Sequence, residues 1–170
     1  MNEIEYEMSR RVLRLWLLVL SSALIALILN LVRIPITLDW YRPEFVVMVI
    51  IFWGVAEPHR IGLSTAWILG LLMDVLENGI LGVQALSLSV IIYLTYLLHP
   101  RLRAFRIVQQ SATVFLLVGI FQLLVRIVNG VLGPVPDTPL YWMPSFTSAL
   151  IWPFLVLILR LLSRAWRITD

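Results

Sequence analysis

Long apolar runs are the feature that most constrains this chain. Residues 13–32, 80–98 and 107–128 are mostly apolar, and each approaches or exceeds the roughly 20 residues that a helix needs to span a bilayer. Residues 145–162 form a fourth run and include Pro153, which we expect to kink the helix or loosen its hydrogen bonding. The whole chain is 61% hydrophobic and 14% charged, whereas soluble domains have about 45–50% apolar and about 25% charged residues. The sequence therefore predicts an integral membrane protein.

Two shorter apolar runs, residues 45–56 and 63–76, lie between the first two long ones. Each is too short to span comfortably, but extending the first back to Trp40 brings it to about bilayer length. No small-residue cleavage site follows the first long run, so we expect a retained helix and not a signal peptide. We predict one all-α transmembrane domain over residues 1–170, and a re-entrant hairpin formed by the two short runs stays open. The predicted helices cover residues 13–32, 40–57, 63–76, 80–98, 107–128 and 145–162.

The positions of the arginines predict the orientation of the helices. All 13 basic residues are arginine, and the six-helix topology leaves Arg33, Arg42 and Arg126 on one side and the other ten on the opposite side. Because basic residues accumulate on the cytoplasmic side, we predict a multi-pass membrane protein with both termini in the cytoplasm. Two arginine-rich segments, residues 101–106 and 160–167, form a basic inner surface for anionic lipid or a cytoplasmic partner. Setting the topology is the simpler interpretation of these arginines.

The sequence contains little that points to catalysis. The absence of cysteine excludes disulfides and thiolate chemistry, and His59 and His99 lie beside prolines at segment ends, which is poor geometry for a metal site. No Ser/His/Asp set or glycine-rich phosphate loop is evident. Glu57 and His59 flank Pro58, but a solvated turn explains them more simply. We therefore expect no enzymatic activity, no metal or other cofactor, and no nucleic acid partner.

Polar residues gather where the predicted helices reach the outer side of the membrane. Ionisable groups within a membrane are costly, so each is a candidate functional residue. We predict that Asp74 faces inward and pairs with Arg126 or Arg33, and that Gly70 lets a neighbouring helix approach closely. Alternatively, these groups mark helix ends and reach water at the headgroup level. The outer polar cluster comprises Asn30, Arg33, Asp74, Glu77, Gln84, Gln122, Arg126 and Asn129.

An ordered set of short sequence features runs through the first half of the chain. Arg42-Pro43 precedes an apolar run that ends in Phe52-Trp53, and His59-Arg60-Ile-Gly62, Gly70-Leu-Leu-Met-Asp74 and Leu81-Gly82 follow. In this order they resemble the rod shape-determining protein MreD family, and the Pro-His-Arg turn resembles its proteobacterial branch. Beyond Gly82 the resemblance rests on length and topology. The candidate residues for helix packing or partner contact are Pro43, Arg60, Gly62, Gly70, Asp74, Gly82, Arg126 and Arg33.

The resemblance implies a non-enzymatic scaffold or regulator of the cell-elongation complex in the bacterial cytoplasmic (inner) membrane. This complex couples peptidoglycan synthesis to rod shape. The implied direct partner is MreC, with the transpeptidase PBP2, the glycosyltransferase RodA and the actin-like MreB in the same complex. The family is also considered similar in fold to the substrate-binding subunits of energy-coupling-factor vitamin transporters. A small-molecule binding subunit of a transporter is therefore the alternative hypothesis. The outer polar cluster suits either a ligand or a partner helix, and the sequence leaves both open.

Overall fold

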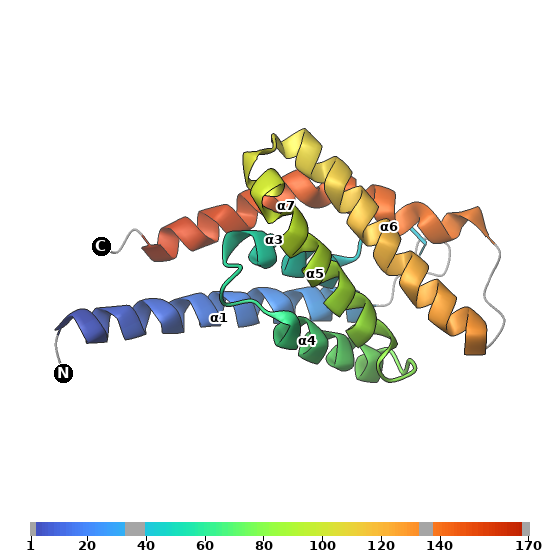
Figure 1. The fold of residues 1–170 in the computed structure, drawn as a ribbon, viewed down its shortest axis with the longest axis horizontal. Coiled ribbons are helices and arrows are strands. Elements are labelled where there is room, and N and C mark those ends of the chain that lie inside the picture. The colour runs from blue at the N-terminus through green and yellow to red at the C-terminus, as the bar shows by residue number, and fades with distance from the viewer. Residues whose placement is uncertain (1–2, 33–39, 133–137, 168–170) are drawn as a thin grey trace.

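The structure, a computed structural model, describes residues 3–32, 40–132 and 138–167. Within these ranges the chain forms six α-helices, one short 3-10 helix and no strand, which confirms the predicted all-α architecture (Figure 1). The helices are α1 (Glu3–Leu31), α3 (Phe45–Ala56), α4 (Leu63–Leu76), α5 (Val83–Ala104), α6 (Ile107–Leu132), η1 (Pro139–Trp142) and α7 (Met143–Arg167).

The six α-helices fall into two length classes. Four segments, in α1, α5, α6 and α7, are long and apolar enough to cross a membrane, which supports the assignment as a membrane protein. Helices α3 and α4 have only 12 and 14 residues. The predicted extension of the second helix back to Trp40 is wrong, because α3 begins at Phe45. Pro43 explains the late start, since proline disfavours helical geometry at the residue before it.

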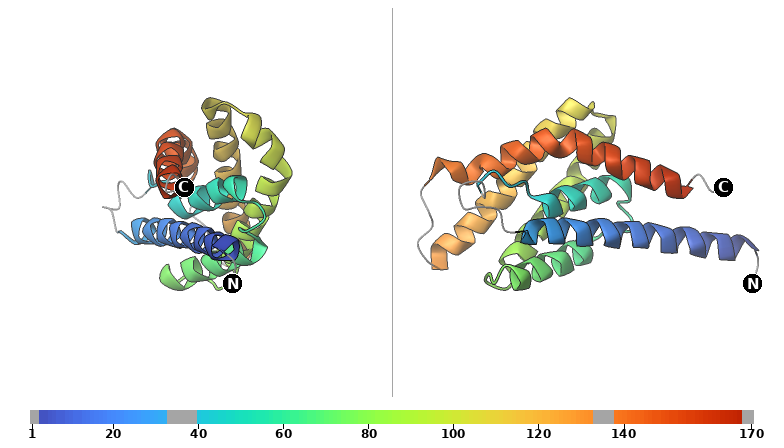
Figure 2. Two further views of the ribbon diagram at one scale, coloured as in Figure 1. Left: turned by 90° about the vertical axis from the view of Figure 1, so that its left-hand side faces the viewer. Right: turned by 180° about the vertical axis from the view of Figure 1, so that it is seen from behind.

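Several helices continue beyond the apolar runs from which they were predicted. Helix α1 begins at Glu3, and α7 continues to Arg167. Apolar residues are needed only within the hydrocarbon core of the membrane. The helix itself can continue beyond that core where its residues are good helix formers, as arginine and glutamate are. The first residue of α1 and the last of α7 lie at the same end of the molecule (Figures 1 and 2). The two ends of the described chain therefore lie on one side, as the predicted topology requires. Following that prediction, we call this end of the bundle the inner end and the opposite end the outer end.

Helix α3 forms the centre of the bundle. Nine of its residues are buried, among them Met48 and Ile51, which are 0% exposed. It packs against α1, α5, α6 and α7, and the view along the molecule shows it between α1 and the later helices (Figure 2). A helix that is apolar on every side belongs in a core. The short apolar run at residues 45–56 is therefore a core helix that is surrounded mainly by longer helices.

Candidate functional site

The outer end of α4 turns sharply into α5. The Gly79 N–H donates to the Asp74 carbonyl at 2.9 Å, and the Asn78 N–H donates to the Val75 carbonyl at 3.4 Å. Asn78 has a φ of 53°. This pattern is a Schellman motif, in which a residue in the left-handed region ends the helix. Asn78 is therefore the left-handed residue that ends α4.

The Asp74 side chain joins this turn to the start of α5. Asp74 is 1% exposed. Its Oδ2 accepts the N–H of Gly82 at 2.8 Å and of Ala85 at 3.4 Å, and its Oδ1 accepts the N–H of Gln84 at 3.0 Å. The first N–H groups of a helix have no intrahelical partner and carry partial positive charge. Asp74 therefore caps the N-terminus of α5 from the neighbouring helix.

This capping role corrects the predicted ion pair of Asp74. Within the described residues, the partners of its carboxylate are main-chain amides of α5 and not the Arg126 guanidinium. Arg126 instead lies over the Tyr141 ring, with its Cζ 5.1 Å from the ring centroid. The alternative partner, Arg33, falls outside the described residues. The prediction considered only charged side chains as partners of the carboxylate. Buried main-chain N–H groups also need an acceptor, and here they supply the partners.

Two glycines on either side of Asp74 shape the hairpin for different reasons. A Cβ on Gly70 would lie 2.2 Å from the Cα of Ala85 and 2.5 Å from its nitrogen, so α4 and α5 meet backbone to backbone there. The expected close approach at Gly70 is confirmed. Gly82 has a φ of 99°, and a Cβ on it would have no atom within 4 Å. The close packing predicted at Gly82 is therefore wrong, and glycine is favoured there by backbone conformation.

The remaining candidates divide between the two ends of the bundle. Arg60 and Gly62 lie in the inner turn between α3 and α4. The Arg60 Nε is 3.9 Å from the Glu57 Oε2, and the Gly62 carbonyl accepts the Thr65 N–H at 3.1 Å. Pro43 lies at the opposite end, where it lines a cleft. The structure thus brings Gly70, Asp74 and Gly82 together and leaves the inner turn separate.

The outer end of the bundle contains a polar cleft of about 570 Å³. Gln84 Nε2 donates to Glu77 Oε2 at 2.6 Å, and Arg42 Nη2 donates to the Leu29 carbonyl at 2.5 Å. Half of the polar cluster predicted from sequence therefore converges on one cavity. The polar residues that line this outer cleft are Asn30, Arg42, Glu44, Glu77, Asn78, Gln84, Gln122 and Tyr141.

Gln122 lines the outer cleft and connects three elements through hydrogen bonds. Its Nε2 donates to the Tyr141 carbonyl at 3.1 Å, and the Tyr141 hydroxyl donates to the Gln122 carbonyl at 2.8 Å. The Ser145 hydroxyl donates to Gln122 Oε1 at 2.5 Å. Both ends of the Gln122 amide are thus paired, as a buried amide requires. This network holds η1 and the start of α7 against α6.

Glu44 is a cleft residue that sequence reasoning missed. It directly precedes α3, and its N–H donates to the Ser148 hydroxyl oxygen at 3.0 Å. Burial raises the pKa of the Glu44 carboxyl to about 7, with a further increase from the negative charge of Glu77 and an opposing effect of Arg42. An acidic residue just before an apolar helix is a recognisable helix-start signal. Its position in the cleft depends on distant elements that no local signal indicates.

Comparisons with known proteins identify the family. The family model described as rod shape-determining protein MreD matches residues 9–162. The chain belongs to the MreD family. A Haemophilus influenzae relative, rod shape-determining protein MreD, is 31% identical over 160 residues that cover 92% of this chain and 97% of the relative. No solved structure matches, so the expected likeness to energy-coupling-factor subunits stays a prediction. Membership in the MreD family gives this membrane protein a role in determining rod shape.

This MreD-family chain has a second concavity, which is apolar and runs between α1 and α7. We call it the α1–α7 groove, and its volume is about 260 Å³. Its floor is α3, through Phe45, Val49 and Trp53. The Trp53 indole N–H donates to the Ser22 hydroxyl oxygen at 2.9 Å, so the deepest polar group of the floor is paired. The groove therefore presents a nearly continuous apolar surface at the side of the bundle.

Proposed function

We propose that this MreD-family chain is a non-enzymatic scaffold of the cell-elongation complex in the bacterial inner membrane. In this proposal the single transmembrane helix of MreC lies in the α1–α7 groove. The groove itself carries the proposal, because it is an apolar depression of about 260 Å³ between two membrane-length helices. Such a shape suits the side chains of a further helix packed against the bundle.

The side chains of α1 in the groove favour a helix as the occupant. Ser21, Ser22 and Ala26 are small, and small residues let two helix backbones approach closely in a membrane. The Ser21 hydroxyl donates to the Leu18 carbonyl at 3.1 Å, and the Ser22 hydroxyl donates to the Val19 carbonyl at 2.9 Å. Both hydroxyl protons are thus already used within α1. An apolar partner helix would leave neither donor unpaired.

The opposite wall supplies the apolar contact area. Phe154 and Ile158 on α7 are 67% and 57% exposed, and Ile25 on α1 is 57% exposed. All three line the groove. Dispersion contacts drive helix association in lipid, since the lipid tails are as apolar as the side chains. A bound MreC helix would connect this chain to PBP2 and RodA on the outer side and to MreB on the inner side.

Cysteine crosslinking tests the location, because the chain has no cysteine of its own. Single cysteines replace Ser21, Ile25 or Ile158, and each is combined with cysteines scanned along the MreC helix. We expect disulfide crosslinks at these positions with a helical period along MreC. The matched control is Leu116→Cys on α6, which is 62% exposed and lies outside the groove. Equal crosslinking of the control, or none in the groove, would refute this docking.

The outer cleft favours a second candidate function, a small-molecule binding subunit. Polar groups from several elements converge on a cavity of about 570 Å³, which is within the size range of ligand pockets. Purification from membranes together with MreC, followed by mass spectrometry of bound small molecules, separates the two functions. Copurified MreC without a stoichiometric ligand supports the scaffold. A stoichiometric ligand without MreC supports the binding subunit.

A further inference from the structure

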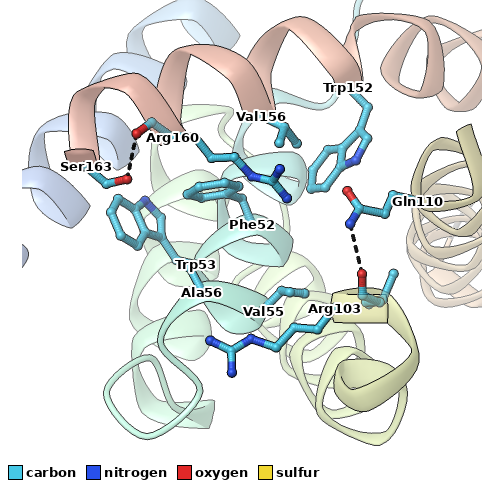
Figure 3. Close-up of a pocket in the computed structure, with 11 residues that line it drawn as sticks. Phe52, Trp53, Val55, Ala56, Arg103, Gln110, Trp152, Val156, Arg160 and Ser163 are labelled. Carbon is cyan, nitrogen blue, oxygen red and sulfur yellow. Dashed lines mark hydrogen bonds between the residues drawn. The ribbon is translucent and has the colours of Figure 1, made fainter. Parts of the chain in front are cut away.

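A third cavity of about 360 Å³ lies at the inner end of the bundle (Figure 3). We call it the inner pocket, and it is bounded by the end of α3, the α5–α6 connection and α7. Aromatic and apolar side chains make up most of its wall. The residues that carry the argument are Phe52, Trp53, Arg103, Gln110, Trp152 and Arg160.

The inner pocket carries two positive charges and no negative one. Arg103 and Arg160 are its charged lining residues. Figure 3 shows Arg160 reaching between Phe52 and Trp152, whereas Arg103 extends along the opposite side of the pocket. Within the described part of the chain, neither guanidinium has an ion-pair partner. Planar guanidinium groups bind phosphate oxygens well, so the charge favours a phosphate-bearing anion.

One buried donor in the wall has no acceptor within the described residues. Trp152 is 3% exposed, and its indole Nε1 is buried with no hydrogen-bond acceptor. Buried polar groups are normally paired, so this N–H needs an explanation. Gln110 uses its Nε2 on the carbonyls of Leu102 at 2.8 Å and Phe105 at 3.3 Å. The indole N–H is buried away from the open space of the pocket, so the two arginines supply the recognition of the occupant.

The surroundings of the inner pocket favour a lipid over a soluble anion. Exposed apolar side chains continue on the same helices, with Val108 on α6 at 80% exposure and Leu157 and Leu161 on α7 at 57% and 56%. These side chains offer a surface for acyl chains on two of the helices that bound the pocket. Basic pockets between transmembrane helices on the cytoplasmic side are suited to anionic head groups. We propose that the inner pocket binds the phosphate-bearing head group of an anionic phospholipid.

Native mass spectrometry of the purified full-length chain tests this site without MreC, so its failure is separable from failure of the scaffold. The protein is titrated with phosphatidylglycerol or phosphatidylcholine. The pocket variant is Arg103→Gln with Arg160→Gln. The control is Arg101→Gln with Arg164→Gln, which removes the same charge from the same helices at exposed residues outside the pocket. We expect roughly thirtyfold weaker phosphatidylglycerol binding in the pocket variant and about threefold or less in the control.

The other outcomes each refute the proposal. Equal weakening by both double substitutions would show general attraction to a basic surface. Binding of phosphatidylcholine as tight as that of phosphatidylglycerol would show that the pocket does not require a lipid with a net negative charge. Displacement of the lipid by inorganic phosphate at the same concentration would indicate a soluble phosphate site.

Discussion

Replacing Asp74 by alanine removes the acceptor of three backbone N–H groups of α5, at 2.8, 3.0 and 3.4 Å. The site is 1% exposed, so water does not replace the carboxylate easily. Each buried hydrogen bond to a charged group contributes about 1.5–3 kcal/mol. Counting the two shorter bonds, we expect the free energy of unfolding to fall by about 3 kcal/mol or more. Asp74→Asn keeps one acceptor oxygen but turns an amide N–H₂ toward the helix, so we expect a loss of about 2 kcal/mol.

Unfolding of the Asp74 variants in mixed detergent micelles, followed by tryptophan fluorescence, measures these losses. The matched control is Val75→Ala in the same turn of α4, which is 61% exposed and should change stability by less than about 0.5 kcal/mol. A double-mutant cycle with Arg126→Ala distinguishes the cap from an ion pair. Additive losses are expected from the cap. Strong coupling between Asp74 and Arg126, or an Asp74→Ala loss no larger than that of Val75→Ala, would refute the capping role.

Three further predictions use the same unfolding assay. Gly70→Ala should cost about 1–3 kcal/mol, because its Cβ would lie 2.2 Å from the Ala85 Cα, and a smaller loss would mean that the α4–α5 contact yields easily. Gly82→Ala should cost about 1–2 kcal/mol because of its φ of 99°, whereas Gly79→Ala, with its nearest atom at 3.7 Å, should be nearly neutral. The pKa of the Glu44 carboxyl rises from 4.5 to about 7 on folding, so the proton binds the folded state more tightly. The contribution of Glu44 to stability is therefore present below pH 4.5 and is lost as the pH rises to about 7, and Glu44→Gln should flatten this dependence.

The lengths of the apolar runs were sufficient to predict the number and type of the described helices, because burial in lipid leaves a strong compositional signal. The same signal placed the core of the second helix but not its start, since Trp40 is compatible with either an interfacial helix or a turn. Gly70 could be interpreted from sequence because a glycine within an apolar helix has few other uses. The role of Gly82 could not be predicted, because glycine is favoured both where helices pack closely and where φ is positive, and the sequence does not distinguish the two.

The partner of Asp74 was beyond sequence reasoning for a related reason. A sequence shows charged side chains directly, so Arg126 was the natural candidate. The unpaired N–H groups at the start of a helix belong to the main chain, and no residue type marks them. The sequence predicted part of the lining of the outer cleft. Asn30, Glu77, Gln84 and Gln122 were grouped by their depth in the membrane and do line it. Glu44 joins them only because the segment before α3 folds back to Ser148 on α7.

The central position of α3 also bears on how the chain is assembled during synthesis. Among the described helices that pack against α3, α1 precedes it, and α5, α6 and α7 are all made later. A helix of 12 residues is about 18 Å long, well short of a bilayer of about 30 Å. Helix α3 therefore leaves the ribosome before most of its neighbours exist. We therefore expect that a truncation after α4 does not yield a smaller version of the bundle, because it would expose the core helix to lipid that it is too short to span.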